Sequence, residues 1–156
     1  MADLKALCEE MKKLRKQIDT ILYVSGYRDC DDLSGLDDYK RIKTADQRQQ
    51  LEECRNILYK LDEVQRSLAY FEEPVRYISK LHMNASGRYE TDKGYYYTSG
   101  SGIEFLRKEE VYNYDTEKWE EAEIWTCSHV ESRDGKYYIV GYPDVELSGL
   151  TVRVRG

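Results

Sequence analysis

The chain has 156 residues, with 24 basic and 30 acidic side chains and a formal net charge of −6. Hydrophobic residues make up only 40% of it, but the 12% of aromatic residues argues for at least one packed core and against a fully disordered chain. No apolar run approaches the roughly 18 residues of a membrane-spanning helix. The first ten residues are too acidic for a signal peptide, and the four cysteines are scattered. We therefore expect a cytoplasmic protein that contacts no membrane.

The first half is expected to form an antiparallel helical hairpin. Ser25 and Gly26 end a first helix of about 22 residues, Thr44 or Asp46 caps a second helix of about 28 residues, and Pro74 stops it. Residues 75–81 could add a short third helix. Apolar residues recur at alternating spacings of three and four, which is typical of coiled coils: Leu4, Leu7, Met11, Leu14, Ile18 and Ile21/Leu22, then Leu51, Cys54, Leu58, Leu61 and Leu68.

This narrow apolar stripe has three possible partners. It can pack on the other helix of the same hairpin, on a second copy of the chain to form a homodimer, or on a target protein. The connection between the helices is long for a helical bundle, and Leu33, Leu36 and Ile42 within it predict that it folds back and packs.

The composition changes near residue 84, where we expect a boundary between a helical domain (1–83) and a small acidic β domain (84–156). Eight of the ten glycines and nine of the 15 tyrosines follow residue 84, together with nine basic and 14 acidic residues. Asp134-Gly135 is a strong hairpin signal, and residues 115–118 can form a second turn. The expected strands are Gly87–Glu90, Tyr95–Thr98, Ile103–Leu106, Glu109–Tyr112, Glu121–Val130, Lys136–Tyr142 and Leu150–Arg155.

The predicted fold class is therefore α+β, a helical hairpin followed by a small antiparallel β unit. Five to seven short strands within about 70 residues are compatible with a twisted barrel of the SH3-like type. An open antiparallel sheet packed on the helices is the alternative.

Glycine turns and strand patterns recur through the second half of the chain, at residues 87–90, residues 101–105, Trp119, residues 135–140 and residues 147–155. Through them the stretch from Gly87 to Gly156 resembles an uncharacterised bacterial family from Firmicutes, a domain of unknown function that is common on phages, plasmids and other mobile elements. The resemblance implies a mobile-element origin but no reaction, cofactor or catalytic residue.

The sequence contains no coherent catalytic set. Cys127 and His129 lie two residues apart on an expected strand, so both point from one face, and an imidazole beside a thiol can activate a cysteine nucleophile. Neighbours at this spacing point in parallel, however, and seldom meet in the required geometry. We expect a non-catalytic protein and keep a Cys/His-dependent enzyme as the alternative.

Metal, nucleotide and nucleic-acid sites are also poorly supported. Neither His82 nor His129 has a partner at zinc-binding spacing. The segment Gly100-Ser101-Gly102 leads into a strand rather than a helix, unlike a phosphate-binding loop. The acidic β domain opposes direct nucleic-acid binding. The acidic loop lacks the pattern of a calcium-binding loop; it contains Asp29, Asp31, Asp32, Asp37 and Asp38. We therefore predict neither metal nor cofactor.

Aromatic residues are the most informative feature of the second half. A small β domain cannot bury all of them, and exposed tyrosine and tryptophan dominate protein interfaces. The alternative is that the tyrosines only satisfy strand propensity and pack internally. We expect a partner-binding surface of aromatic and acidic residues, made up of Tyr95, Tyr97, Tyr112, Tyr114, Trp119, Glu121, Glu123, Trp125 and Tyr138.

The functional hypothesis is a protein-binding module that recognises a basic protein. With the mobile-element resemblance, a finer version is an inhibitor of a host defence protein, comparable to an anti-CRISPR protein that occupies a basic nucleic-acid-binding groove. A structural protein that dimerises through the helical hairpin is a further alternative.

Overall fold

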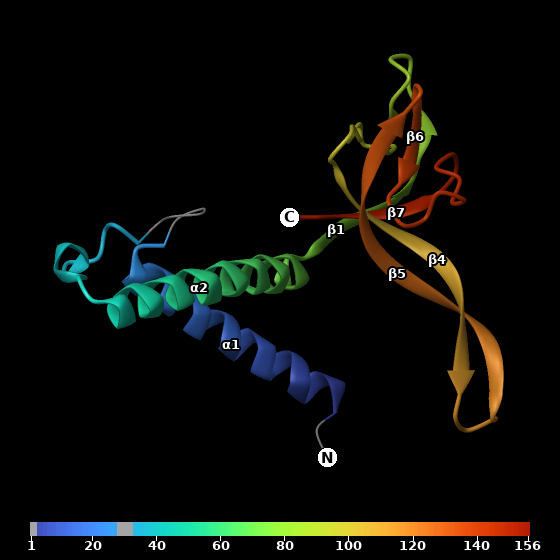
Figure 1. The fold of residues 1–156 in the computed structure, drawn as a ribbon. Helices are drawn as coiled ribbons and strands as arrows, with labels where there is room; N and C mark the ends of the chain where they lie inside the picture. Colours follow the sequence, from blue (N-terminus) through green and yellow to red (C-terminus); the bar gives the residue numbers. More distant parts are fainter. Residues whose placement is uncertain (1–2, 28–32) are drawn as a thin grey trace. The chain divides into compact units, whose positions relative to one another are not determined.

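The computed structural model describes residues 3–27 and 33–156. The chain divides into two compact units, unit 1 (Met1–Glu73) and unit 2 (Pro74–Gly156). The division lies about ten residues before the boundary expected from composition, because the first residues after Pro74 form a strand of unit 2. The fold class is α+β, with two helices followed by antiparallel strands (Figure 1).

Unit 1 contains the two expected helices, α1 (Leu4–Ser25) and α2 (Ala45–Glu72), and a short 3₁₀ helix, η1 (Tyr39–Arg41). Gly26 adopts the left-handed conformation that ends α1. Thr44 caps α2 in a reciprocal capping box with Gln47. The lengths of 22 and 28 residues agree with the predicted ones, since both are set by local capping signals.

The two helices pack against each other through only part of the apolar stripe. Ile18 of α1 and Leu58 of α2 are buried, and the side chains of Asp19 and Gln65 are hydrogen bonded. Leu33, from the connection, packs with Leu58, so the connection does fold back as predicted. Asp29, Asp31 and Asp32 of the acidic loop lie outside the described residues. Much of the stripe remains exposed, including Leu4, Leu7, Met11, Leu14 and Ile21.

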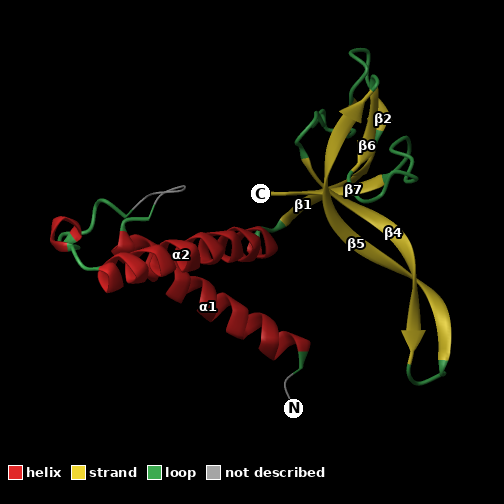
Figure 2. Cartoon of the chain, in the orientation of Figure 1, coloured by secondary structure: helices red, strands yellow, loops and turns green. Residues whose placement is uncertain are grey.

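Unit 2 consists of strands (Figure 2). The expected helix over residues 75–81 is wrong, because this segment is a strand that pairs antiparallel with the last strand of the chain. The expected strands Ile103–Leu106 and Glu109–Tyr112 are one continuous strand. The strands are β1 (Val75–Lys80), β2 (His82–Met83), β3 (Tyr89–Glu90), β4 (Gly102–Asn113), β5 (Lys118–Arg133), β6 (Lys136–Ile139) and β7 (Thr151–Arg155).

The main sheet has the order β1-β7-β4-β5-β6, and β2 and β3 form a separate two-stranded sheet. The main sheet does not close into a barrel, so the expected SH3-like barrel is not formed and the sheet is open. Its core lies on one face, where Phe105 and Val152 are fully buried opposite each other on neighbouring strands. Leu81, Tyr97, Ile103, Val130, Ile139 and Leu147 complete this core.

The hairpin of β4 and β5 is longer than the rest of the sheet. Its register runs from Gly102 opposite His129 to Asn113 opposite Lys118. Strand β7 pairs with β4 at Phe105, and β6 pairs with β5 from Val130 onward. Beyond these positions β4 and β5 pair only with each other. We call residues 107–124 the ribbon; it extends away from the rest of unit 2 (Figure 1).

Candidate aromatic interface on the ribbon

Three aromatic side chains meet at the end of the ribbon. Tyr112 lies directly opposite Trp119 in the hairpin register, and their ring centroids are 5.5 Å apart. Tyr114, in the turn, lies 5.1 Å from Tyr112. The rings meet at steep interplanar angles of 69° and 82°, a favourable edge-to-face arrangement. We call these three residues the ring cluster.

The ring cluster is open to solvent. Tyr114 is 85% exposed, Trp119 is 67% exposed and Tyr112 is 39% exposed. Two-stranded ribbons bury little apolar surface of their own, because neither face packs on a core. Exposed tyrosine and tryptophan side chains in one place are therefore typical of an interaction surface rather than of a folding core.

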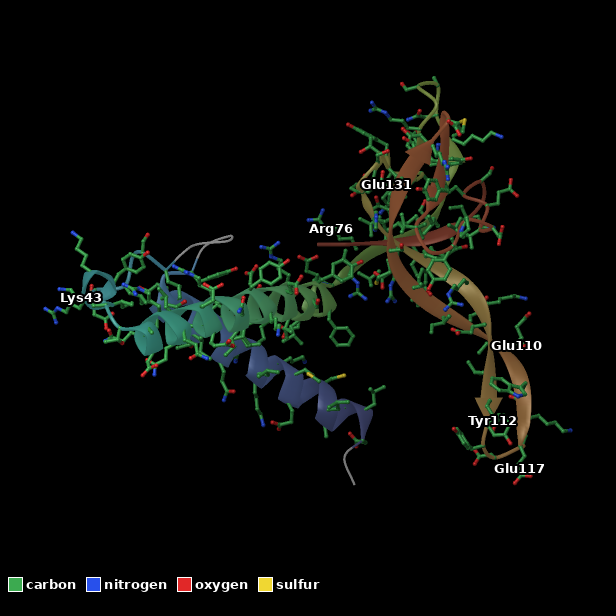
Figure 3. The ribbon with its side chains drawn as sticks, viewed as in Figure 1. Lys43, Arg76, Glu110, Tyr112, Glu117 and Glu131 are labelled. Atoms are coloured by element: carbon green, nitrogen blue, oxygen red, sulfur yellow. The ribbon has the colours of Figure 1, made fainter. Side chains whose placement is uncertain are left out.

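Acidic residues follow the rings along the ribbon. Side chains alternate between the two faces of a strand, so the face that carries Tyr112 and Trp119 also carries Glu110, Glu121 and Glu123. The ribbon contains three basic and seven acidic residues, whereas the rest of unit 2 contains eight basic and seven acidic ones. The negative charge of unit 2 is therefore concentrated on the ribbon, where Figure 3 labels Glu110 and Glu117.

The turn at the end of the ribbon is fixed by hydrogen bonds to Glu120. Nδ2 of Asn113 donates to one carboxylate oxygen at 3.0 Å, and the hydroxyl of Thr116 donates to the other at 2.7 Å. These hydrogen bonds lower the pKa of the fully exposed Glu120 carboxyl, because they stabilise its charged form. Glu120 lies on the opposite face from the ring cluster, so it holds the turn without covering the rings.

The nine residues predicted for the interface do not form one surface. Tyr112, Tyr114 and Trp119 meet, and Glu121, Glu123 and Trp125 continue along the same face of β5. The remaining three residues lie elsewhere in unit 2: Tyr95 and Tyr97 follow β3, and Tyr138 lies on β6.

Tyr97 is not a surface residue. It is 2% exposed and belongs to the core with Ile103 and Phe105, and burial raises the pKa of its hydroxyl. Tyr95 packs edge to face on Tyr97 at 5.1 Å, which ties it to that core. Tyr95, Tyr96 and Tyr97 are consecutive in the sequence, and the sequence alone does not show which of the three rings points inward.

Glu110 was not among the nine residues that the sequence predicted for the interface. Glu110 lies directly opposite Glu121, one same-face position from the pair formed by Tyr112 and Trp119. Folding the sequence about the predicted turn at residues 115–118 would have paired these two glutamates. Because like charges directly opposite each other destabilise a sheet, this pair marks a position where the sequence does not serve stability.

Cys127 and His129 lie on β5 as expected, on the same face as Trp125. Both are exposed, and Nε2 of His129 lies 4.0 Å from the carboxylate of Glu131. Among the described residues, no group of three or more histidine, cysteine, aspartate or glutamate side chains could hold a metal ion.

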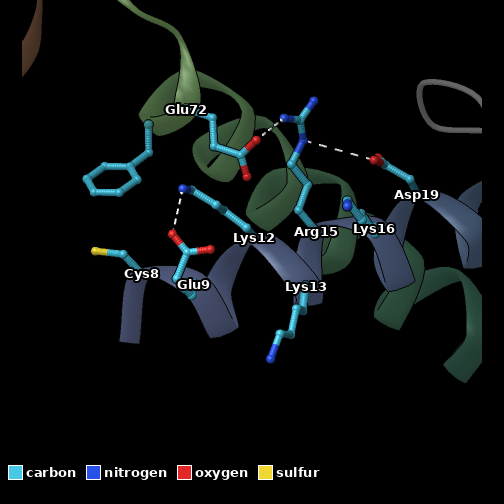
Figure 4. A pocket seen from close by; sticks show the side chains of 9 residues that line it. Cys8, Glu9, Lys12, Lys13, Arg15, Lys16, Asp19 and Glu72 are labelled. Atoms are coloured by element: carbon cyan, nitrogen blue, oxygen red, sulfur yellow. Dashed lines mark hydrogen bonds and ion pairs between the residues drawn. The ribbon is translucent and has the colours of Figure 1, made fainter. Parts of the chain in front are cut away.

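A second candidate site is an open groove of about 990 Å³ on unit 1 (Figure 4). Two ion pairs lie within it: Arg15 with Glu72 at 2.7 Å and Lys12 with Glu9 at 2.9 Å. Cys8 and Phe71 line the same groove. Four basic and three acidic side chains line the groove, so its net charge is small and it offers no strong attraction to an ion.

The family comparison concerns unit 2. Residues 80–154 match a family model described as a domain of unknown function (DUF5348). This match confirms the expected resemblance to an uncharacterised family. The matched residues include the whole ribbon and ring cluster, but not β1 before Lys80. Comparisons with curated proteins and with solved structures find no match. In the part of the chain that the structure describes, no helix is long and apolar enough to cross a membrane.

Proposed function

We propose that unit 2 is a non-catalytic protein-binding module that presents the ribbon to a basic partner protein. The observation that carries the proposal is the ring cluster, three exposed aromatic side chains at the end of a ribbon that packs on no core. Tyrosine and tryptophan supply large contact area at a low entropic cost, which suits an interface.

The charge of the ribbon selects the class of partner. With seven acidic and three basic residues, it repels nucleic acid and attracts a positively charged protein surface. Such attraction is screened by salt, so the complex should weaken as ionic strength rises.

In a finer form of this proposal, the protein acts in the cytoplasm of a Firmicutes bacterium, is encoded by a mobile element and inhibits a host defence protein. The ribbon carboxylates would occupy a basic groove that normally binds nucleic acid, as in a CRISPR effector. Such a groove must accommodate an extended rod of negative charge, and the two-stranded ribbon has that form.

Capture from a host lysate, treated with nuclease, tests the proposal. The full chain should retain a basic protein at low salt and release it at high salt. Replacing both Tyr114 and Trp119 with serine should abolish retention, whereas replacing the equally exposed Tyr23 of α1 with serine should not. Retention that is unchanged by the double substitution, or the absence of any basic protein at both salt concentrations, would contradict it.

A second candidate function is dimerisation through unit 1. The observation that favours it is the exposed part of the apolar stripe on α1, where Leu7, Met11 and Leu14 lie on one side of the helix. Light scattering over a concentration series tests it: a dimer of the unchanged chain should dissociate in Leu14→Asp. A monomer at all concentrations would exclude this role.

A further inference from the structure

We infer that the ring cluster, together with Glu110, is a binding site for the guanidinium group of a partner's arginine. This inference rests on the proposed function and identifies the chemical group that the ribbon recognises. It is carried by two independent observations, the cation contacts of the other aromatic rings and the charge pattern beside the ring cluster.

Unit 2 places its own cations over its aromatic rings. Four such contacts occur, with the cation 4.5 to 5.2 Å from the ring centroid, and arginine supplies three of them. Cations over aromatic faces are attracted by the ring quadrupole. The pairs are Arg88 with Tyr96, Lys93 with Tyr77, Arg107 with Tyr142 and Arg153 with Trp125.

The ring cluster has no such cation among the described residues. Lys118 is adjacent in sequence to Trp119, but strand alternation places it on the opposite face of the ribbon. Lys108 is on the same face as the rings, but its ammonium group binds Glu121 at 2.6 Å. The three rings therefore offer the same chemistry as Trp125 or Tyr142 with the cation position open.

The charge pattern beside the rings favours a cation. Glu110 and Glu121 are directly opposite each other, and the single neighbouring lysine binds Glu121. No described residue forms a hydrogen bond or an ion pair with the Glu110 carboxylate. A cation placed beside Glu110 would relieve the repulsion between the two carboxylates and satisfy the one that lacks a partner.

The spacing suits arginine. Residues two apart on a strand are about 7 Å apart along it, so the carboxylate of Glu110 and the ring of Tyr112 lie within reach of one side chain. A guanidinium group can stack on a ring through its face and donate hydrogen bonds to a carboxylate through its edge, whereas an ammonium group cannot do both as well. A second copy of the ribbon is disfavoured as the occupant, because both copies carry excess negative charge.

The two tryptophans of the chain make the test internally controlled. In a ¹⁵N NMR spectrum of the full chain, each indole N–H gives one signal. Titration with a short arginine-rich peptide should shift the Trp119 signal and leave that of Trp125, which Arg153 already covers, nearly unchanged. A peptide with citrulline in place of arginine has the same shape without the charge and should shift neither signal.

Matched substitutions locate the site. Glu110→Gln and Tyr114→Ala should each weaken binding of the arginine peptide about two- to fivefold. Glu123 lies one same-face position beyond Glu121 on β5, and Glu123→Gln is the control that should weaken binding less. Equal shifts of both indoles, equal binding of the citrulline peptide, or equal effects of Glu110→Gln and Glu123→Gln would overturn the inference. Tighter binding of a lysine peptide would overturn the choice of a guanidinium group.

The test of the arginine site and the test of the proposed function can fail independently. If arginine peptides fail to bind but substitution of Tyr114 and Trp119 still abolishes capture of a basic protein, the ribbon binds proteins by another mode. If arginine peptides bind as described but the substitutions leave capture unchanged, the cation site exists and the proposed function is wrong.

Discussion

Nε of Arg155 donates a hydrogen bond to Oε2 of Glu104 across 2.8 Å, although 51 residues separate the two in the chain. Arg153 forms an ion pair with the same carboxylate. Glu104 is only 3% exposed, so one buried carboxylate holds two guanidinium groups of β7 against β4. The opposite face of these strands carries Phe105 and Val152. A buried charge is tolerated only while it is paired.

We therefore predict that Glu104→Ala destabilises unit 2 by about 3–5 kcal/mol, since it removes the buried carboxylate that pairs with two partly buried guanidinium groups. Urea unfolding followed by tryptophan fluorescence measures this effect, and it reports unit 2 alone because Trp119 and Trp125 both lie there. Glu110→Ala is the matched control, with an expected change within about 0.5 kcal/mol. Equal effects of the two substitutions would contradict a structural role for Glu104.

Folding and binding should be separable on the same domain. Tyr114 is largely exposed, so Tyr114→Ala should change the free energy of unfolding by less than about 1 kcal/mol. Phe105 is fully buried, and Phe105→Ala should cost about 3–5 kcal/mol. The same urea titration compares them. A large loss of stability in Tyr114→Ala would mean that the ring cluster serves folding and would weaken the case for an interface.

Local signals in the sequence were sufficient for unit 1. Gly26 and Thr44 limit the helices through capping geometry that depends only on neighbouring residues. Strand β1 was missed because its partner, β7, lies some 75 residues further along the chain, and no local pattern reveals that pairing. The covered part of the apolar stripe could not be predicted for a similar reason: heptad spacing shows that a helix face is apolar, but not which part of it another helix covers.

The part of the candidate site that could be predicted is the part whose strand pairing is set by a nearby turn. The turn at residues 115–118 sets the pairing of Tyr112 with Trp119, and both residues were predicted. Tyr97 was assigned to the interface and is a core residue, because the direction of its side chain depends on tertiary contacts with Ile103 and Phe105. The charge of unit 2 could be placed on the ribbon only after the structure showed which strands pair beyond the core.

The turn between β5 and β6 depends on left-handed backbone at both of its residues, with φ of 53° at Asp134 and 75° at Gly135. We predict that Gly135→Ala destabilises unit 2 by about 1–2 kcal/mol through backbone strain alone, since no atom lies within 4 Å of the added Cβ. Gly102 has equal space but no positive φ, so Gly102→Ala should have little effect. Urea unfolding that ranks Gly102→Ala as the more damaging substitution would contradict this account.

The order of the ribbon turn should depend on pH through Glu120. Hydrogen bonds from Asn113 and Thr116 lower the pKa of its carboxyl below the ordinary value of 4.5. Because folding lowers this pKa, the carboxylate stabilises the turn fully when the pH is above the ordinary pKa. This stabilisation is lost as the pH falls through the lowered pKa. We expect the NMR signals of Thr116 and Tyr114 to lose dispersion only in that acidic range and to be constant near neutral pH.

An NMR titration of the Glu120 carboxyl carbon in the full chain measures the pKa directly. Thr116→Val removes one of the two donors, so it should raise the pKa of Glu120 toward 4.5 and loosen the turn at a higher pH. Thr98→Val, elsewhere in unit 2, is the control and should leave the pKa unchanged. A Glu120 pKa of 4.5 or above in the unchanged chain would show that these hydrogen bonds do not hold the turn in solution, and the rigid presentation of the rings would then need another cause.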